Sequence, residues 1–162
     1  MILDCEDLNG RSGHVAGREL LAKCYRQQTG EDLPPVRITP RGKPYFENSP
    51  WHFSISHTPN HVFCVLAKHN VAIDAEEADR GINLRLADKI LSPGEKAQFD
   101  AAQDQRTALL TFWVLKECAA KLSGDGLRGY PNHTNFSLDD ARVTNLHGCL
   151  VAVMEEGDTY VV

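Results

Sequence analysis

The sequence lacks long apolar runs, paired cysteines and low-complexity tracts. No apolar stretch among its 162 residues approaches the roughly 20 residues needed to cross a bilayer. Residues 1–7 have neither the basic region nor the apolar stretch of a signal peptide. The five cysteines are scattered without a Cys-x-x-Cys pair, which favours reduced thiols over a disulfide framework. We therefore expect a cytoplasmic protein with no membrane partner.

Positive charge is also in short supply. The net charge of -5 argues against non-specific binding to nucleic acid or to an anionic membrane surface. No glycine-rich phosphate loop is present. A local basic pocket is still compatible with this charge, because Arg37, Arg41 and Lys43 lie close together in the sequence. The apolar fraction of 42% and the length are sufficient for one sizeable core or two small halves.

Helical patterns occur in the first quarter of the chain and again after its middle. Residues 13–29 carry an apolar face and are followed by Gly30 as a stop signal. Residues 83–91 are a second helical segment, and residues 92–95 (Ser-Pro-Gly-Glu) form a capping box that predicts the start of a third. A longer helix is predicted over residues 106–122.

Period-two alternation predicts strands between and after these helices. Residues 51–76 contain three such segments, separated by turns at residues 59–60 and 68–70, and we expect them to form an antiparallel meander. Residues 31–50 hold five of the eight prolines and are predicted to be mainly a loop. Mixed strands and helices give an α+β fold class. Further extended segments are predicted at residues 36–38, 135–138, 149–153 and 159–162.

Three carboxylates and a lysine form the pattern that carries chemistry. On a strand, Asp74 and Glu76 project to the same face, roughly 7 Å apart at the backbone. On a helix, Trp113, Glu117 and Lys121 share one stripe. Together they suit a hard divalent cation such as Mg²⁺ that holds a phosphate-bearing substrate. The alternative is a solvated strand edge and a surface i, i+4 ion pair, each common without any ligand.

Histidines and basic residues before this pattern are less specific. His52, His57 and His61 lie close together, but no cysteine or carboxylate lies at a recognisable zinc spacing, so the sequence does not favour zinc. Arg41 and Lys43 could contact phosphate, although such a basic loop is more often simply solvated.

Four segments, in order and with matching spacing, resemble the 4'-phosphopantetheinyl transferase superfamily of the surfactin-synthetase-activating type. Each motif alone is weak, but four in register are strong, and the resemblance spans roughly residues 10 to 140. Within the third segment, Ala72 and Ala75 replace the family's usual glycine and isoleucine. The segments are Gly42-Lys43-Pro44, Phe53-Ser54-Ile55-Ser56-His57-Thr58, Ala72-Ile73-Asp74-Ala75-Glu76 and Trp113-x-x-Lys116-Glu117-x-x-x-Lys121.

The resemblance implies a Mg²⁺-dependent transfer of the 4'-phosphopantetheine arm of coenzyme A. The acceptor would be a serine hydroxyl of an apo acyl or peptidyl carrier protein, and adenosine 3',5'-bisphosphate would be released. It also implies an α+β fold of two similar halves, residues 1–68 and 69–162, each a helix on a small antiparallel sheet. The halves would be related by a pseudo-twofold axis, with coenzyme A in the cleft between them.

The resemblance also assigns roles to individual residues. The implied catalytic residues are Glu117, Lys121 and His57, with Glu117 as the base for the incoming serine. The implied metal ligands are Asp74, Glu76 and Glu117. The implied coenzyme A contacts are Arg41, Lys43, Ser56, His57, Asp74 and Lys121.

Two rival functions are also compatible with the sequence. One is a catalytically inactive carrier-protein or nucleotide-binding module of the same fold, and the other is an unrelated Mg²⁺-dependent phosphotransferase. A complete set of carboxylates together with Lys121 favours the enzyme, and the missing glycine-rich loop disfavours the unrelated phosphotransferase. Family members are usually longer at both ends. If the second half lacks its closing strand, we expect residues 159–162 to form a sheet edge that either pairs with another chain or is covered by the strand order.

Overall fold

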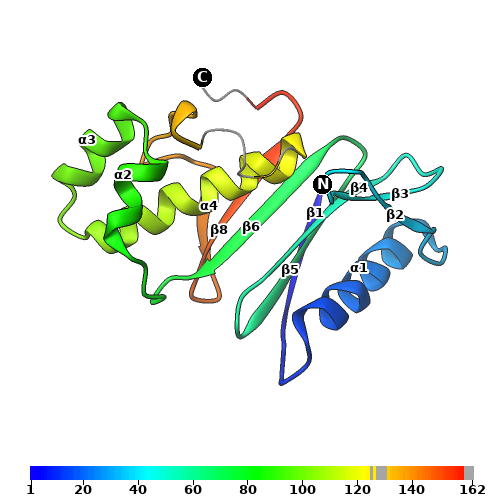
Figure 1. The fold of residues 1–162 in the computed structure, drawn as a ribbon. Helices are drawn as coiled ribbons and strands as arrows, with labels where there is room; N and C mark the ends of the chain where they lie inside the picture. Colours follow the sequence, from blue (N-terminus) through cyan, green and yellow to red (C-terminus); the bar gives the residue numbers. More distant parts are fainter. Residues whose placement is uncertain (125, 127–130, 159–162) are drawn as a thin grey trace.

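The computed structural model describes residues 1–124, 126 and 131–158 (Figure 1). The strands of this described part form two three-stranded antiparallel sheets and one two-stranded hairpin. They are β1 (Ile2–Asp7), β2 (Val36–Ile38), β3 (Pro44–Phe46), β4 (His52–His57), β5 (His61–Ala67), β6 (Val71–Glu77), β7 (Val143–Leu146) and β8 (Cys149–Glu155).

The helices lie outside these sheets. None of those described has the length and apolar character needed to span a bilayer. They are the α-helices α1 (Gly13–Thr29), α2 (Ala87–Ile90), α3 (Pro93–Ala101) and α4 (Gln105–Ser123), and the 3-10 helices η1 (Leu84–Leu86) and η2 (Pro131–His133). The observed mixture of helices and antiparallel sheets confirms the α+β class.

The first structural unit is a sheet of order β1-β5-β4 covered by α1 (Figure 1). The Ser12 hydroxyl caps the start of α1 by accepting a hydrogen bond from the Val15 amide. Gly30 ends the helix in the left-handed region at φ 74°, a conformation that favours glycine. The helix predicted over residues 13–29 is therefore confirmed.

The second unit is a sheet of order β6-β8-β7 covered by α4. Asp104 caps α4 through the Thr107 amide, and Gly124 ends it at φ 76°. The predicted capping box is present at α3, where the Ser92 and Glu95 side chains each accept from the other's backbone amide. The helix predicted over residues 106–122 and the capping box predicted at residues 92–95 are thus confirmed.

The predicted meander is wrong in its third strand. β4 and β5 pair as expected, but β6 pairs with β8, with Asp74 opposite Ala152. The other edge of β5 pairs with β1, a strand that was not predicted from the sequence. Alternation identifies a strand but not its partner, and here the partners come from the two ends of the chain.

Two further segments differ from their predictions. Residues 31–50 contain the hairpin β2-β3 rather than a loop with one extended piece. Residues 135–138 do not form a strand, because the amides of Phe136 and Leu138 donate to side chains of α3, Glu95 and Gln98. The strand predicted over residues 149–153 is confirmed within β8. Residues 159–162 lie outside the described part of the chain.

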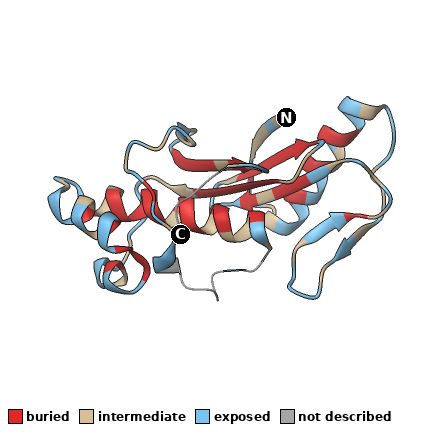
Figure 2. Cartoon of the chain, turned by 90° about the horizontal axis from the view of Figure 1, so that it is seen from above, coloured by how far each residue is buried: buried red, intermediate tan, exposed pale blue. Residues whose placement is uncertain are grey.

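The two units share a core. Figure 2 shows buried residues concentrated along the central strands and on α4. The division at residues 68 and 69, and the pseudo-twofold relation between the units, stay predictions. The shared cluster comes from β5, β6 and β8 and contains Phe63, Val65, Ala67, Val71, Ile73, Ala75, Cys149 and Val151.

Candidate functional site

A cavity of about 270 Å³ is lined by residues of both units. The first unit and its hairpin contribute a basic loop and the middle of β4, and the second contributes the carboxyl-terminal half of α4. Four of the predicted site residues meet here: Arg41, Lys43, Glu117 and Lys121. The remaining described lining is Gly42, Pro44, Phe53, Ser54, Ile55, Ala120, Gly124 and Gly126.

Asp74 is buried, as is its neighbour Ser56 among the predicted site residues. Its carboxylate accepts hydrogen bonds from Lys121 Nζ at 2.6 Å and from Ser56 Oγ at 3.1 Å. Ser56 Oγ also accepts from the Ala75 amide, so it joins β4 to β6. Burial raises the pKa of Asp74, and the Lys121 ammonium partly offsets this shift.

Glu76 lies on the same side of β6, where it contacts the same helix. Its Oε1 accepts a hydrogen bond from the indole nitrogen of Trp113 at 3.1 Å, and Arg80 forms an ion pair with it. Asp74 and Glu76 thus contact α4 eight residues apart, through Lys121 and Trp113. The same-face geometry predicted for the strand, and the stripe predicted for the helix, are both confirmed.

Glu117 lies on that stripe between Trp113 and Lys121. Burial raises the pKa of its carboxyl group, the nearby charges of Asp74 and Glu76 raise it further, and Lys121 opposes them. Three carboxylates therefore repel one another in a partly buried place. Their all-oxygen ligand set and mutual repulsion fit a hard cation such as Mg²⁺.

The carboxylates are not yet arranged around one point. Among the described residues, three ligand atoms lie within 4.8 Å of one another only at His61, Glu77 and Cys149. Lys121 holds Asp74 and Arg80 holds Glu76, so Asp74, Glu76 and Glu117 would have to move closer to share one ion.

Lys43 crosses from the hairpin to the second unit. Its ammonium donates to Asn70 Oδ1 at 2.7 Å and to the Leu122 carbonyl at 2.8 Å, at the end of α4. Burial lowers the pKa of Lys43. The lysine therefore stands at the cavity wall with its charge already partly desolvated, which strengthens its interaction with an anionic ligand.

His57 is at the exposed end of β4 and does not line this cavity. Its ring packs on the start of α1, where a Cβ added to Gly13 would lie 2.5 Å from the ring. Ser56 is buried and engaged with Asp74. The contacts of Ser56 and His57 with coenzyme A stay predictions.

Lys116, a motif residue to which the sequence analysis assigned no role, is buried. Lys116, beside Glu117, forms an ion pair with Glu95 at 2.7 Å, and both side chains are essentially inaccessible to solvent. Glu95 is also the residue that completes the capping box at Ser92. The capping box was visible in the sequence, but nothing in it indicated a buried partner on α4.

Comparison with known proteins agrees with the resemblance. Residues 70–156, more than half of the chain, match the family model of the 4'-phosphopantetheinyl transferase superfamily. A segment of 88 residues is 32% identical to a protein named 4'-phosphopantetheinyl transferase gsp from Aneurinibacillus migulanus. The matched segment covers 53% of this chain and 36% of that relative, so the match spans about a third of the relative's length.

Proposed function

The chain belongs to the 4'-phosphopantetheinyl transferase superfamily, and we propose that it transfers the 4'-phosphopantetheine arm of coenzyme A to a carrier protein. The acceptor is a serine hydroxyl of an apo acyl or peptidyl carrier protein, and the released product is adenosine 3',5'-bisphosphate. The observation that supports this most is the cavity in which Lys43 of one unit faces Glu117 and Lys121 of the other.

The basic residues of the cavity position the nucleotide. Lys43 and Arg41 bind phosphates of coenzyme A from the hairpin side, His57 contacts the nucleotide from the end of β4 outside the cavity, and buried Ser56 acts by holding Asp74. Lys121 faces the pyrophosphate from α4. Charge-assisted hydrogen bonds of this kind are shorter and stronger than neutral ones, and they fix the phosphorus in line with its attacker.

Glu117 is the proton acceptor of this proposal. The serine oxygen forms a bond to the β-phosphorus, the bond from that phosphorus to the leaving phosphate of the nucleotide breaks, and the serine proton goes to Glu117. The raised pKa of Glu117 makes it a stronger base than an exposed carboxylate. Asp74, Glu76 and Glu117 would hold Mg²⁺, whose charge would neutralise the pyrophosphate oxygens.

Recognition of the carrier protein has to be local. Carrier proteins are often acidic, and the net charge of this chain is -5, so overall charge opposes their encounter. A basic or apolar patch near the cavity must therefore make the contact. A cytoplasmic location suits this partner, and all five cysteines are free thiols.

The direct test is mass spectrometry of apo carrier proteins incubated with coenzyme A and Mg²⁺. We expect a mass increase of one phosphopantetheine arm on at least one carrier from fatty-acid, polyketide or peptide synthesis. Glu117→Gln should lower the rate by on the order of 10²-fold or more. The matched control, Glu31→Gln, changes an exposed carboxylate outside the cavity and should transfer normally.

Two results would contradict the proposal. Transfer by Glu117→Gln at the wild-type rate would remove this residue from catalysis. Coenzyme A binding without transfer to any of the three carrier classes would identify the inactive binding module instead.

A further inference from the structure

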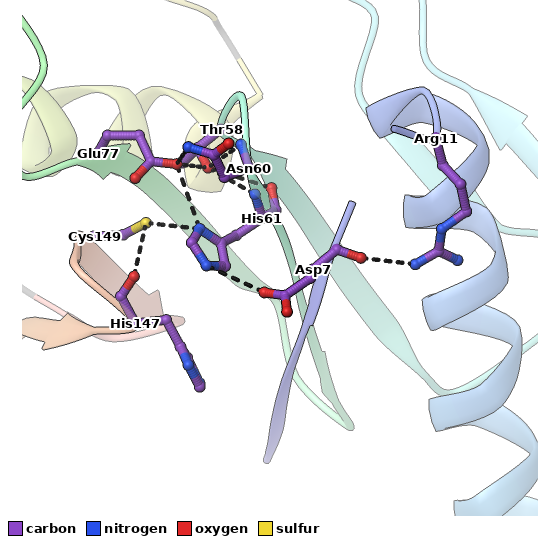
Figure 3. A network of polar contacts seen from close by, with 8 residues as sticks. All are labelled: Asp7, Arg11, Thr58, Asn60, His61, Glu77, His147 and Cys149. Carbon is purple, nitrogen blue, oxygen red and sulfur yellow. Dashed lines mark hydrogen bonds and ion pairs between the residues drawn. The ribbon is translucent and has the colours of Figure 1, made fainter. Parts of the chain in front are cut away.

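A second cluster of possible metal ligands lies at one end of the joined sheets (Figure 3). His61 is the first residue of β5, Glu77 the last of β6 and Cys149 the first of β8. The sheet register fixes their positions, because Glu77 is directly opposite Cys149 in one ladder and His61 is opposite Asp7 in the other. The cluster therefore forms where the two units meet.

Two of the three distances within this cluster match the edges of a tetrahedral zinc site. His61 Nδ1 lies 3.4 Å from Glu77 Oε1 and 3.6 Å from Cys149 Sγ. All three ligand atoms lie within 4.8 Å of one another. In a tetrahedral site with ordinary Zn–N, Zn–O and Zn–S bond lengths, the N–O edge is about 3.4 Å and the N–S edge about 3.6 Å. His61 Nδ1 thus already lies at the spacing needed to share one ion with each of the other two ligand atoms.

We propose that His61, Glu77 and Cys149 form a binding site for Zn²⁺. An imidazole nitrogen, a carboxylate and a thiolate are the three ligand types that zinc takes in proteins, whereas Mg²⁺ prefers oxygen alone. The Cys149 thiol loses its proton to solvent when it binds, and the imidazole binds in its neutral form. This site is independent of the transferase proposed above.

The surroundings of the cluster are those of a supported metal site. His61 Nε2 lies 3.3 Å from Asp7, so a ring that binds metal through Nδ1 would donate its other N–H to this carboxylate. Glu77 Oε1 accepts from Thr58 Oγ1 at 2.6 Å and from Asn60 Nδ2 at 3.2 Å. These contacts fix the orientation of two of the three ligands before any ion arrives.

In the proposed site a water takes the fourth position, on the side of His61 and Glu77, because Cys149 itself is buried. His147 lies near, but its ring centroid is 6.0 Å from that of His61, and Figure 3 shows its ring directed away from Cys149. The side chains of His61 and Glu77 keep 17% and 15% of their exposure, so solvent reaches the cluster. Three protein ligands with a water in the fourth position is a familiar zinc arrangement.

Strand geometry separates this cluster from the carboxylates of the cavity. Glu76 and Glu77 are neighbours on β6, and successive side chains of a strand point to opposite faces. Glu76 contacts Trp113 of α4, whereas Glu77 contacts the turn before β5. An ion at His61, Glu77 and Cys149 would therefore join β5 of the first unit to β6 and β8 of the second, away from Glu117.

The experiment is a titration of the reduced, chelator-treated full chain with Co²⁺, a spectroscopic substitute for zinc, followed by competition with Zn²⁺. We expect one equivalent to produce a thiolate-to-cobalt absorption band and visible bands of a tetrahedral ion, and Zn²⁺ to remove both. Cys149→Ser should abolish the thiolate band, and His61→Gln should weaken binding more than 100-fold. Asp7→Asn should weaken it by roughly 10- to 100-fold, as expected for a residue that orients a ligand.

Matched controls separate this site from other thiols, histidines and carboxylates. Cys24→Ser changes a buried thiol of the first unit's own core, and His52→Gln changes an exposed histidine at the other end of the sheet. Asp74→Asn alters the carboxylates of the cavity. All three should keep the thiolate-to-cobalt band and its Co²⁺ dependence as in the wild type.

The proposal is overturned if the wild type gives no thiolate band, or if Cys149→Ser and His61→Gln bind Co²⁺ as tightly as the wild type. In that case the cluster is a polar contact between the two units without a metal. Circular dichroism tests whether each variant is folded. If Cys149→Ser is unfolded, the test rests on His61→Gln.

Discussion

At the residue scale, the carboxylates near α4 are held in a state that the metal-free fold disfavours. Burial raises the pKa of both Asp74 and Glu117. The negative charge of Glu76 raises both further, and that of Asp74 adds to the shift of Glu117. A raised carboxyl pKa means that the native state binds a proton more tightly than the unfolded state. The charged form of Glu117 therefore opposes folding when no cation is present.

This predicts that Glu117→Gln stabilises the metal-free protein at neutral pH. Between the ordinary carboxyl value of 4.5 and the raised pKa of Glu117, the native state carries the extra proton, so stability falls as pH rises through that window. Above the raised pKa of Glu117 the full loss of stability is present, and below pH 4.5 the loss disappears. Melting temperatures measured with chelator should favour the variant near pH 7 and converge with wild type toward pH 4.5. A variant less stable than wild type at pH 7 would contradict this.

Lys43 and His57 bear on coenzyme A affinity. Lys43→Ala and His57→Ala should each weaken binding by roughly 1–3 kcal/mol, the range for a lost charge-assisted hydrogen bond. The KM for coenzyme A should rise while the KM for the carrier protein stays unchanged. Calorimetry against the exposed control Lys89→Ala provides the comparison. Equal nucleotide affinity in all of these proteins would exclude both residues from the site.

Local periodicity was enough to predict which candidate residues face one another across β6 and α4. Spacing of two on a strand and four on a helix placed Asp74, Glu76 and Lys121 on facing surfaces, as observed. The cluster of His61, Glu77 and Cys149 could not be predicted in this way. Its members come from three strands, and only the pairing of β6 with β8 brings the last two together.

At the element scale, the junction of α3 and α4 depends on one buried ion pair. Glu95 accepts from the Ser92 amide at 2.8 Å, from the Phe136 amide at 3.0 Å and from Lys116 Nζ at 2.7 Å. Lys116 also donates to the carbonyl and hydroxyl of Thr134. One carboxylate therefore connects the start of α3, the middle of α4 and the segment after α4.

Removing one partner of this pair should be strongly destabilising. Lys116→Met leaves the Glu95 carboxylate buried without its cation, and Glu95→Leu leaves the ammonium buried. We expect each to lower the free energy of unfolding by about 3–5 kcal/mol. The double variant should lose less than the two single losses combined, because no uncompensated charge remains. Urea unfolding measures all three, and strictly additive losses would show that the pair is not coupled.

Helices were predicted better than sheets for a physical reason. The ends of α1, α3 and α4 are set by local capping residues, which a sequence displays directly. Strand pairing depends on residues far along the chain, so the partners of β5 and β6 were not predictable from their own alternation. Residues 135–138 have the composition of a strand, but side chains of α3 satisfy their amides.

At the scale of the whole molecule, the two units are joined by a common core and by groups at both ends of it. β5 and β6 contribute to one buried cluster, Ser56 links β4 to Asp74, and Lys43 links the hairpin to the end of α4. The proposed substrate cavity uses residues of both units. A ligand held there contacts both units at once and therefore favours the assembled native state over the unfolded one.

Mg²⁺ together with coenzyme A should consequently raise the melting temperature. A ligand that binds only the native state adds about 2.7 kcal/mol at a concentration 100 times its Kd, which corresponds to about 5 to 10 °C for a chain of this size. Mg²⁺ alone should give a smaller shift, because the carboxylates gain a cation but the basic side chains of the cavity gain no phosphate.

Measuring the shift in a His61→Gln background removes any contribution from ions bound beside Cys149. Glu117→Gln should lose most of the Mg²⁺-dependent part while keeping a shift from coenzyme A through Lys43. If Mg²⁺ and coenzyme A together leave the melting temperature unchanged, the cavity between the units does not bind them.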